Sequence, residues 1–250
     1  MHDPGRPPEH VPDGPPADRR RGAHLETLPE ERVTRNAKGL ITHVKNAGGK
    51  YVPVKEYVQE LSARRAQVIA TGTGKKDGPC SAAAIDLRTG TITEGVNGRP
   101  NDLVKPEDVH PVLRKNLEDL GHWQYPVKES ETTLYQWQGA DLVQDGRAHH
   151  DDPLRHAEVK ATKELLWERE RLAREAGGAP PTGEALAEMR IDPRWIGKGS
   201  ALGVGGPAAA CANCDTVLRG VPSYSGRFSY SPRDYRYPDN KHSFETDAGL

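Results

Sequence analysis

The strongest secondary-structure signal in the chain is HAEVKATKELLWERERLAREA, at residues 156–176. This stretch is rich in Ala, Leu, Glu, Lys and Arg, which have high helix propensities. Ala161, Leu165 and Leu172 fall on one stripe, so the helix has an apolar face that must be buried against another element. Glycine and proline end the pattern at residues 177–183. The chain therefore folds around a long amphipathic helix.

Two short apolar runs precede this helix. SAAAIDL at 81–87 and TITEGVN at 91–97 are separated by RTG, a glycine-containing turn, and this pattern predicts a β-hairpin. Residues 54–68 carry apolar side chains at i, i+3, i+4 and i+7 positions, which predicts a further helix that ends at TGTGKKDGP, residues 71–79.

The rest of the chain has weaker patterns. They predict a long connection at 98–150 with one helix at Pro106–Leu120, a helical turn at 184–190, a short buried strand at 201–206, the first turns of a helix at 211–218, and a strand followed by irregular chain at 221–231.

The N-terminal part is predicted to be a disordered leader. Met1–Pro29 holds seven prolines and three consecutive arginines, with almost no large apolar side chain. Such a segment cannot bury enough surface to offset the entropy of ordering it. We therefore predict a proline-rich leader at 1–49, an ordered domain at 50–231 and an irregular tail at 232–250.

Composition excludes several classes of protein. The formal net charge is −1, so no large field of one sign draws the whole molecule to nucleic acid or to an anionic membrane. No apolar run approaches the roughly 18 residues of a membrane span, and the first residues lack the basic-then-apolar pattern of a secretory signal. Three cysteines are too few for a disulfide scaffold.

Histidine and cysteine side chains are spaced like metal ligands. H-A-E at 156–158 opens the long helix, and C-A-N-C at 211–214 opens a later one. Two sulfurs three residues apart lie on one helix face, and a helix N-terminus favours the thiolate form. One imidazole and two thiolates give zinc three protein ligands and leave a fourth position for water, as in catalytic sites. Glu158 can then shuttle protons between that water and a substrate.

Each of these residues has a simpler interpretation when taken alone. A lone histidine is usually a surface or core residue, and C-x-x-C also occurs in redox proteins and structural zinc sites. A structural site needs a fourth ligand, and Cys80, the remaining cysteine, is more typical of a small buried residue. Side chains two residues apart on a helix point about 200° apart. His156 and Glu158 therefore converge only if His156 lies at the very start of the helix.

H-x-E followed by P-C-x-x-C is the signature of zinc nucleobase deaminases. The predicted order of a helix, a hairpin, the HAE helix, a strand and the CxxC helix is that of the cytidine-deaminase-like superfamily. More narrowly, CSAAAIDLRTG, EGVNG, HAEVKA and CANC resemble the YwqJ-related deaminases of bacterial polymorphic toxins. The resemblance covers Val54–Ser231.

This resemblance implies a three-layer α/β/α sandwich of the cytidine-deaminase-like type, with long insertions. It implies a Zn²⁺ ion bound by His156, Cys211 and Cys214, with Glu158 as the catalytic acid and base. In such enzymes an asparagine near position 97 contacts the sugar of the substrate, which makes Asn97 a candidate substrate-binding residue. An Asn-Gly step is equally typical of a turn, and both interpretations stay open.

The sequence departs from the family pattern in three places. Ala210 stands where the family usually has proline before the first cysteine, a change that removes no ligand. The interval from Glu158 to Cys211 is long, which predicts an insertion around residues 168–200. The connection from the hairpin to the HAE helix is also long.

The implied function is deamination of a nucleobase, cytosine to uracil in single- or double-stranded DNA or RNA, by an interbacterial toxin effector. The resemblance also implies a cognate immunity protein and secretion into the cytoplasm of a target cell, without a membrane partner. Two alternatives stay open. One is a deaminase of free nucleosides or nucleotides, which the near-neutral charge fits equally well. The other is a non-catalytic zinc-binding interaction module.

Overall fold

The computed structural model describes most of the chain between residues 21 and 226. The described ranges are 21–72, 79–98, 102–118, 124–125, 135–138, 141–144, 147–149, 153–197, 202–210, 214 and 217–226. Residues 1–20 of the predicted leader, Cys211 and the predicted tail at 232–250 lie outside these ranges.

The described chain contains both helices and strands. The first half contains β1 (Ala23–Thr27), the 3-10 helix η1 (Glu30–Arg32), β2 (Val33–Arg35), β3 (Ile41–Lys45), β4 (Tyr51–Pro53), α1 (Val54–Gly72), β5 (Cys80–Asp86), β6 (Thr91–Val96), η2 (Pro106–Asp108) and α2 (Pro111–Glu118). The second half contains β7 (Gln124–Tyr125), β8 (Tyr135–Gln138), β9 (Asp141–Gln144), β10 (Arg147–His149), η4 (Pro153–Arg155), α3 (Ala157–Glu175), η5 (Gly183–Glu188) and β11 (Met189–Trp195).

The central sheet has the strand order β1-β6-β5-β11, and each neighbouring pair is antiparallel. The pair β5–β6 confirms the predicted hairpin, with Ile85 opposite Ile92. A parallel bridge between Ile191 and Ser223 adds one further point of pairing beyond β11. Every residue of β5 and β6 is buried, so both faces of the sheet are covered.

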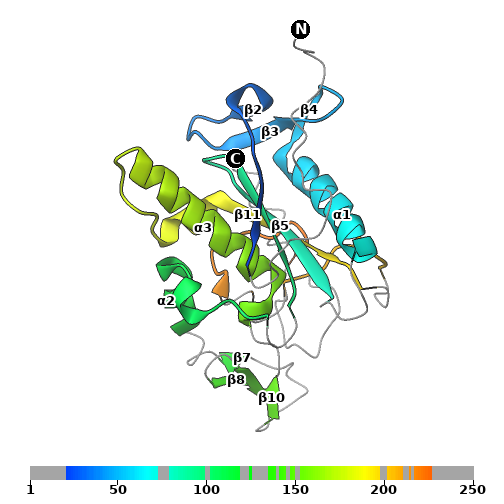
Figure 1. The fold of residues 1–250 in the computed structure, drawn as a ribbon, viewed down its shortest axis with the longest axis vertical. Coiled ribbons are helices and arrows are strands. Elements are labelled where there is room, and N and C mark those ends of the chain that lie inside the picture. Colours follow the sequence, from blue (N-terminus) through cyan, green and yellow to red (C-terminus); the bar gives the residue numbers. More distant parts are fainter. Residues whose placement is uncertain are drawn as a thin grey trace.

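Two helices cover the opposite faces of the sheet. Ala84 belongs to the apolar cluster that contains Leu165 of α3, whereas its neighbour Ile85 belongs to the cluster that contains Val58 and Leu61 of α1. Successive side chains of a strand point to opposite faces, so α1 and α3 lie on different sides of β5. Figure 1 shows the two helices flanking β5 and β11. The fold is thus of the mixed α/β class.

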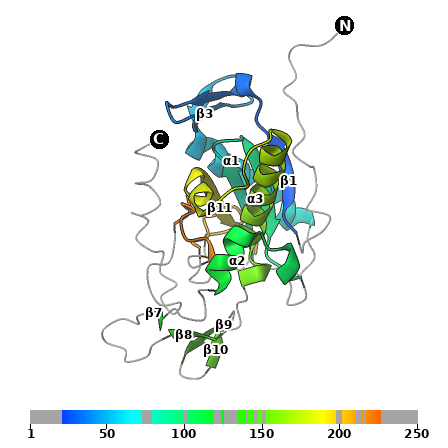
Figure 2. The same cartoon turned by 90° about the vertical axis from the view of Figure 1, so that its left-hand side faces the viewer.

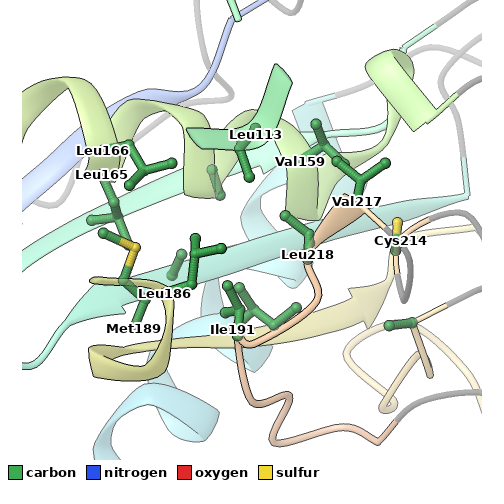
Figure 3. Close-up of a cluster of buried hydrophobic side chains, with 14 of the residues drawn as sticks. Leu113, Val159, Leu165, Leu166, Leu186, Met189, Ile191, Cys214, Val217 and Leu218 are labelled. Atoms are coloured by element: carbon green, nitrogen blue, oxygen red, sulfur yellow. The ribbon is translucent and has the colours of Figure 1, made fainter. Parts of the chain in front are cut away.

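The larger apolar cluster lies between α3, α2 and β11. Figure 3 shows that Val159 of α3 and Ile191 of β11 approach Val217 and Leu218 from the chain after α3, with Cys214 at the edge of the cluster. All five side chains are buried. Burial of a valine or leucine contributes about 1.5–3 kcal/mol, so the turn that carries Cys214 is anchored by apolar packing.

The prediction of a disordered leader through residue 49 is wrong from residue 21 onward. β1 pairs with β6, and β2, β3 and β4 form an antiparallel sheet of their own. Leu25, Ile41 and Val44 are buried in the cluster beside α1. Isolated apolar residues of this kind do not stand out among polar neighbours, but together they cover one end of the core. Figures 1 and 2 place this small sheet at the opposite end of the molecule from β7–β10.

The strand predicted at 201–206 is also wrong. Gly203 and Gly205 have φ values of 70° and 84°, which are incompatible with an extended strand. Leu202 is 47% exposed. The apolar composition of this stretch reflects small residues in turns rather than a buried strand.

The next core strand is instead β11, within the predicted insertion at 168–200. Its sequence MRIDPRW contains three charged residues. They obscure the alternating apolar pattern to which Met189 and Ile191 belong. Asp192 is buried and accepts hydrogen bonds of 2.6 Å from Arg194 Nε and from Ser225 Oγ. Buried charges are tolerated when they are paired and hydrogen-bonded. The long interval between the two predicted ligand groups therefore holds a core strand.

Four predicted helices are confirmed with shifted boundaries, whereas the helix predicted at 211–218 and the strand predicted at 221–231 lie only partly within the described residues and stay predictions. α1 and α3 match the predicted helices, η5 occupies the predicted helical turn, and α2 lies inside the predicted helix Pro106–Leu120. The connection at 98–150 also contains an antiparallel sheet, β10-β9-β8-β7, which was not predicted. Among the described residues, the helices are too short or too polar to cross a lipid bilayer.

Candidate metal centre

The first residue of the site lies at the start of α3. His156 is the N-cap residue, with extended backbone angles of φ −75° and ψ 142°, and Ala157 begins the helix. The N–H of Lys160 donates to the carbonyl of His156 over 3.1 Å, which closes the first helical turn. Because His156 stands outside the spiral, its side chain and that of Glu158 are not held 200° apart. The condition for their convergence is met.

The cysteine of the site comes from the chain that follows β11. Cys214 is fully buried, and the N–H of Leu218 donates to its carbonyl over 2.8 Å, an i to i−4 bond of helical type. Nδ1 of His156 lies 3.0 Å from Sγ of Cys214. Val217 and Leu218 pack against Val159 in the same apolar cluster as Cys214, and this packing holds Cys214 beside His156.

His156, Glu158 and Cys214 form one buried group. One nitrogen, one carboxylate oxygen and one sulfur, taken from these three side chains, all lie within 4.8 Å of one another. The side chains are 3%, 5% and 0% exposed. Residues of these types seldom cluster in an interior without either mutual hydrogen bonds or a bound cation.

The donor set fits a zinc ion. Imidazole nitrogen and thiolate sulfur are preferred zinc ligands, with bonds of about 2.0–2.1 Å and 2.3 Å. Tetrahedral bonds of these lengths place nitrogen and sulfur about 3.6 Å apart, and Nδ1 of His156 lies 3.0 Å from Sγ of Cys214, so a small outward movement of the two side chains makes room for the ion. These side chains can therefore hold a metal ion. Cys211, the other predicted ligand, lies outside the described residues, so its part in the site stays a prediction.

The strand β6 approaches the start of α3 unusually closely. A Cβ atom added to Gly95 would lie 2.1 Å from the carbonyl oxygen of Ala157. Only glycine allows this contact between two backbones. The EGVNG motif that carries the resemblance thus has a steric reason for its first glycine, a role that the sequence interpretation missed.

Asn97, the candidate substrate-binding residue, also lies against the start of α3. Its Oδ1 accepts a hydrogen bond of 2.7 Å from the N–H of Ala157. Its own N–H donates to the carbonyl of Cys80 over 2.9 Å. Asn97 therefore contacts the residue between His156 and Glu158, and its role in binding a substrate stays a prediction. Cys80 is buried and is not among the residues grouped with His156 in the described part of the chain.

Two further sets of buried charged side chains contact β6 and were not predicted. Arg65 of α1 makes a bidentate ion pair with Glu94 of β6, with Nε–Oε2 and Nη2–Oε1 distances of 2.8 and 2.6 Å. Lys160, fully buried on α3, donates from Nζ to the carbonyl of Val96 over 3.0 Å. The sequence signal for Lys160 was its position four residues after His156, which places it on the same face of the helix.

A cavity of about 610 Å³ lies beside α2. Its lining includes Val109, Arg114 and Leu117, together with Leu154, two residues before His156. A volume of this size is typical of a small-molecule site. None of the three residues of the metal group belongs to its described lining, so the cavity is separate from the metal group.

Comparisons of the chain with protein-family models, with curated proteins and with solved structures find no match. The geometry of the site therefore carries the functional argument.

Proposed function

We propose that this protein is a zinc-dependent deaminase that acts on a nucleobase, with cytosine in DNA or RNA as the favoured substrate. The observation that carries the proposal is the convergence of His156, Glu158 and Cys214 at the buried start of α3. Two metal-binding side chains with an adjacent carboxylate are the working parts of the zinc deaminases.

The order of the elements supports the same proposal. α1, the hairpin β5–β6, α3 with its H-A-E start, the strand β11 and the turn with Cys214 follow one another along the chain. This is the order of the cytidine-deaminase-like sandwich, and the helices on both faces of the sheet agree with its three layers. We therefore assign the chain to that fold as part of the proposal.

The chemistry follows from the positions of the side chains. A zinc ion bound by His156, Cys214 and the predicted ligand Cys211 would supply a Lewis acid, which makes water nucleophilic near neutral pH. The Glu158 carboxylate accepts a proton from water and delivers it to the ring nitrogen. Oxygen adds to C4 of cytosine as a hydroxyl. Glu158 then takes the proton of this hydroxyl and passes it to the amino group, the C4–N bond breaks, and ammonia leaves. Cytosine and water thus give uracil and ammonia.

Burial of the site fits this reaction. Glu158 is only 5% exposed, so its carboxylate exchanges protons with a confined water rather than with bulk solvent. A base inside a duplex would have to leave the stack before it reached such a site, at a cost of a few kcal/mol. A single-stranded substrate avoids that cost, so we expect faster reaction on single strands.

Free nucleosides or nucleotides are the second candidate substrates. The observation that favours them is the formal net charge of −1, which provides no overall attraction to a polyanion. Release of ammonia from cytidine or a cytidine nucleotide, with no change in oligonucleotides, would select this alternative.

The decisive experiment combines base-resolved sequencing with a matched pair of variants. Purified protein is incubated with single- and double-stranded DNA and RNA, and cytosine-to-uracil changes are counted. Glu158→Gln should abolish the changes while metal content is retained. Glu175→Gln, at an exposed position of the same helix, should react like the wild type. Persistent activity in Glu158→Gln would contradict the role given to this carboxylate. A folded, metal-binding protein without activity on any cytosine or adenine substrate would favour the non-catalytic module.

The toxin role rests on the resemblance to the YwqJ-related deaminases. It extends the proposal to an immunity protein that blocks the site and to action in the cytoplasm of a target cell. Expression of the wild type should slow bacterial growth and raise the number of cytosine-to-thymine mutations, and expression of Glu158→Gln should do neither.

A further inference from the structure

We propose that Asn97 is a positioning residue that caps α3 from outside the helix and so fixes the start that carries His156 and Glu158. This inference takes its functional meaning from the proposed metal site. The observation behind it is the 2.7 Å hydrogen bond from the N–H of Ala157 to Oδ1 of Asn97.

A helix leaves the N–H groups of its first turn without partners within the helix. The N-cap side chain usually accepts one of these hydrogen bonds, and Ser, Thr, Asp and Asn are the preferred residues. In α3 the N-cap is His156, whose side chain makes no capping hydrogen bond. Its Nδ1 lies instead 3.0 Å from Sγ of Cys214. Because the metal group occupies the N-cap side chain, the cap has to come from elsewhere.

Asn97 supplies that cap from the end of β6. Asparagine is among the best capping residues because its short side chain ends in an amide oxygen. Its backbone is itself held, since the N–H of Asn97 donates to the carbonyl of Cys80 on the neighbouring strand β5. The cap is therefore tied to the rigid hairpin and not to a free loop.

The neighbours of Asn97 reinforce the same contact on both sides of the metal group. The N–H of Gly98 donates to the carbonyl of Arg155 over 2.9 Å, just before His156. The carbonyl of Val96 accepts from Nζ of Lys160 over 3.0 Å, just after Glu158. Together with the 2.7 Å bond to Ala157, these hydrogen bonds hold the end of β6 in a fixed position against the first turn of α3.

The hydrogen bond also fixes how the amide of Asn97 is turned. Oδ1 accepts from Ala157, so donation of a hydrogen bond to a substrate would come from Nδ2. Aspartate has the same shape and keeps an acceptor at Oδ1, but it lacks the donor. Alanine removes both. The two substitutions therefore separate the capping role from donation to a substrate.

The experiment is a metal-binding titration of the full-length protein with Co²⁺ and Zn²⁺, followed by the cobalt absorption spectrum and by competition with a chelator. Asn97→Ala should weaken metal binding about tenfold, as loss of an outer-sphere partner does, and should broaden the cobalt bands. Asn97→Asp should stay within about twofold of the wild type, because carboxylates are favourable caps. The matched control is Asn46→Ala, which removes an Oδ1 that accepts the N–H of Lys50 over 3.0 Å, in a turn of the β2–β4 sheet. It should leave metal binding unchanged.

Equal metal affinity in Asn97→Ala and in the wild type would overturn the proposal. So would an equal loss in Asn97→Ala and Asn97→Asp, because the shared acceptor would then be irrelevant. If the wild type bound neither metal, the proposed function would fail, and the cap would be judged by thermal unfolding. Asn97→Ala should then have a lower melting temperature than Asn46→Ala, whereas Asn97→Asp should not. Any other order of melting temperatures would reject the capping role.

Discussion

Nδ1 of His156 lies 3.0 Å from Sγ of Cys214, although 58 positions separate the two residues in the chain. Both side chains are buried, at 3% and 0% exposure. The contact joins the start of α3 to the turn after β11. Removal of either side chain should therefore affect the metal and the packing of this turn together.

Replacement of Cys214 should abolish stoichiometric metal binding. In Cys214→Ala, one of the two proposed sulfur ligands is lost, and we expect zinc content after dialysis to fall from about one equivalent to near zero. The control is Cys80→Ala, a buried cysteine outside the metal group of the described residues. Metal analysis of the purified proteins makes the comparison. Full zinc content in Cys214→Ala would remove this residue from the site.

Removal of the metal should also destabilise the folded protein. Ions that bind only the native state raise its stability by mass action, so we expect a strong chelator to lower the melting temperature of the wild type. The same chelator should leave the melting temperature of Cys214→Ala unchanged. Differential scanning calorimetry with and without chelator provides the measurement. An identical drop in both proteins would indicate that the chelator acts elsewhere.

Gly95→Ala should displace the start of α3. The added Cβ would lie 2.1 Å from the carbonyl oxygen of Ala157, and neither backbone can yield without a shift of β6 or α3. Overpacking of this kind costs about 1–3 kcal/mol, and we expect a loss of metal affinity as well. Gly183→Ala is the control, since a Cβ there meets no atom within 4 Å. Urea unfolding measures the first effect and metal titration the second.

The buried ion pair between Arg65 and Glu94 should be far more sensitive to truncation than an exposed pair. Its side chains are 3% and 2% exposed, so Glu94→Ala leaves a buried guanidinium without its carboxylate. Such a loss typically costs about 3–5 kcal/mol. Glu175→Ala breaks an exposed pair with Arg171 on α3, and its urea midpoint should match that of the wild type. Similar midpoints for the two variants would show that the buried charge is not isolated from water.

The acid stability of the fold should depend on Glu188. Hydrogen bonds from Arg88 and Arg169 lower its pKa from 4.5 to about 2, against the opposing effect of burial. The folded state then binds fewer protons than the unfolded chain, so the stabilisation is complete above pH 4.5 and is lost as the pH falls towards 2. Allowing for partial exposure, it amounts to about 1–3 kcal/mol. Glu188→Gln should show a flatter decline of unfolding free energy over this range, and an unchanged slope would contradict the assignment.

Local patterns in the sequence were sufficient for several elements. The 3.6-residue periodicity predicted α1 and α3, and the turn RTG between two apolar runs predicted the hairpin β5–β6. These predictions succeeded because each pattern is contained in a short stretch of chain. The H-A-E spacing also placed His156 and Glu158 at the start of one helix, where the structure has them.

Patterns of charge misled the prediction of other elements. β11 carries Arg190, Asp192 and Arg194, which would be costly to bury alone. Asp192 becomes acceptable in the core only through its hydrogen bonds with Arg194 and Ser225. The partner Ser225 lies 33 positions away, and no local pattern could reveal it. The strands of residues 23–53 were missed for a related reason, because their apolar side chains are scattered along the chain and join one cluster only when the strands pack with α1 and β5.

The amino-acid sequence by itself determined which side chains could bind a metal, where the long helices run, and that histidine and carboxylate share one helix start. Tertiary structure decided that Cys214 meets His156 and that Asn97 serves as a cap for α3. The physical reason is that both contacts cross between elements: one depends on the apolar packing of Val217 and Leu218, and the other on the absence of a side chain at Gly95. Helix and hairpin signals act over a few residues, whereas these contacts exist only once the sheet and α3 have packed together.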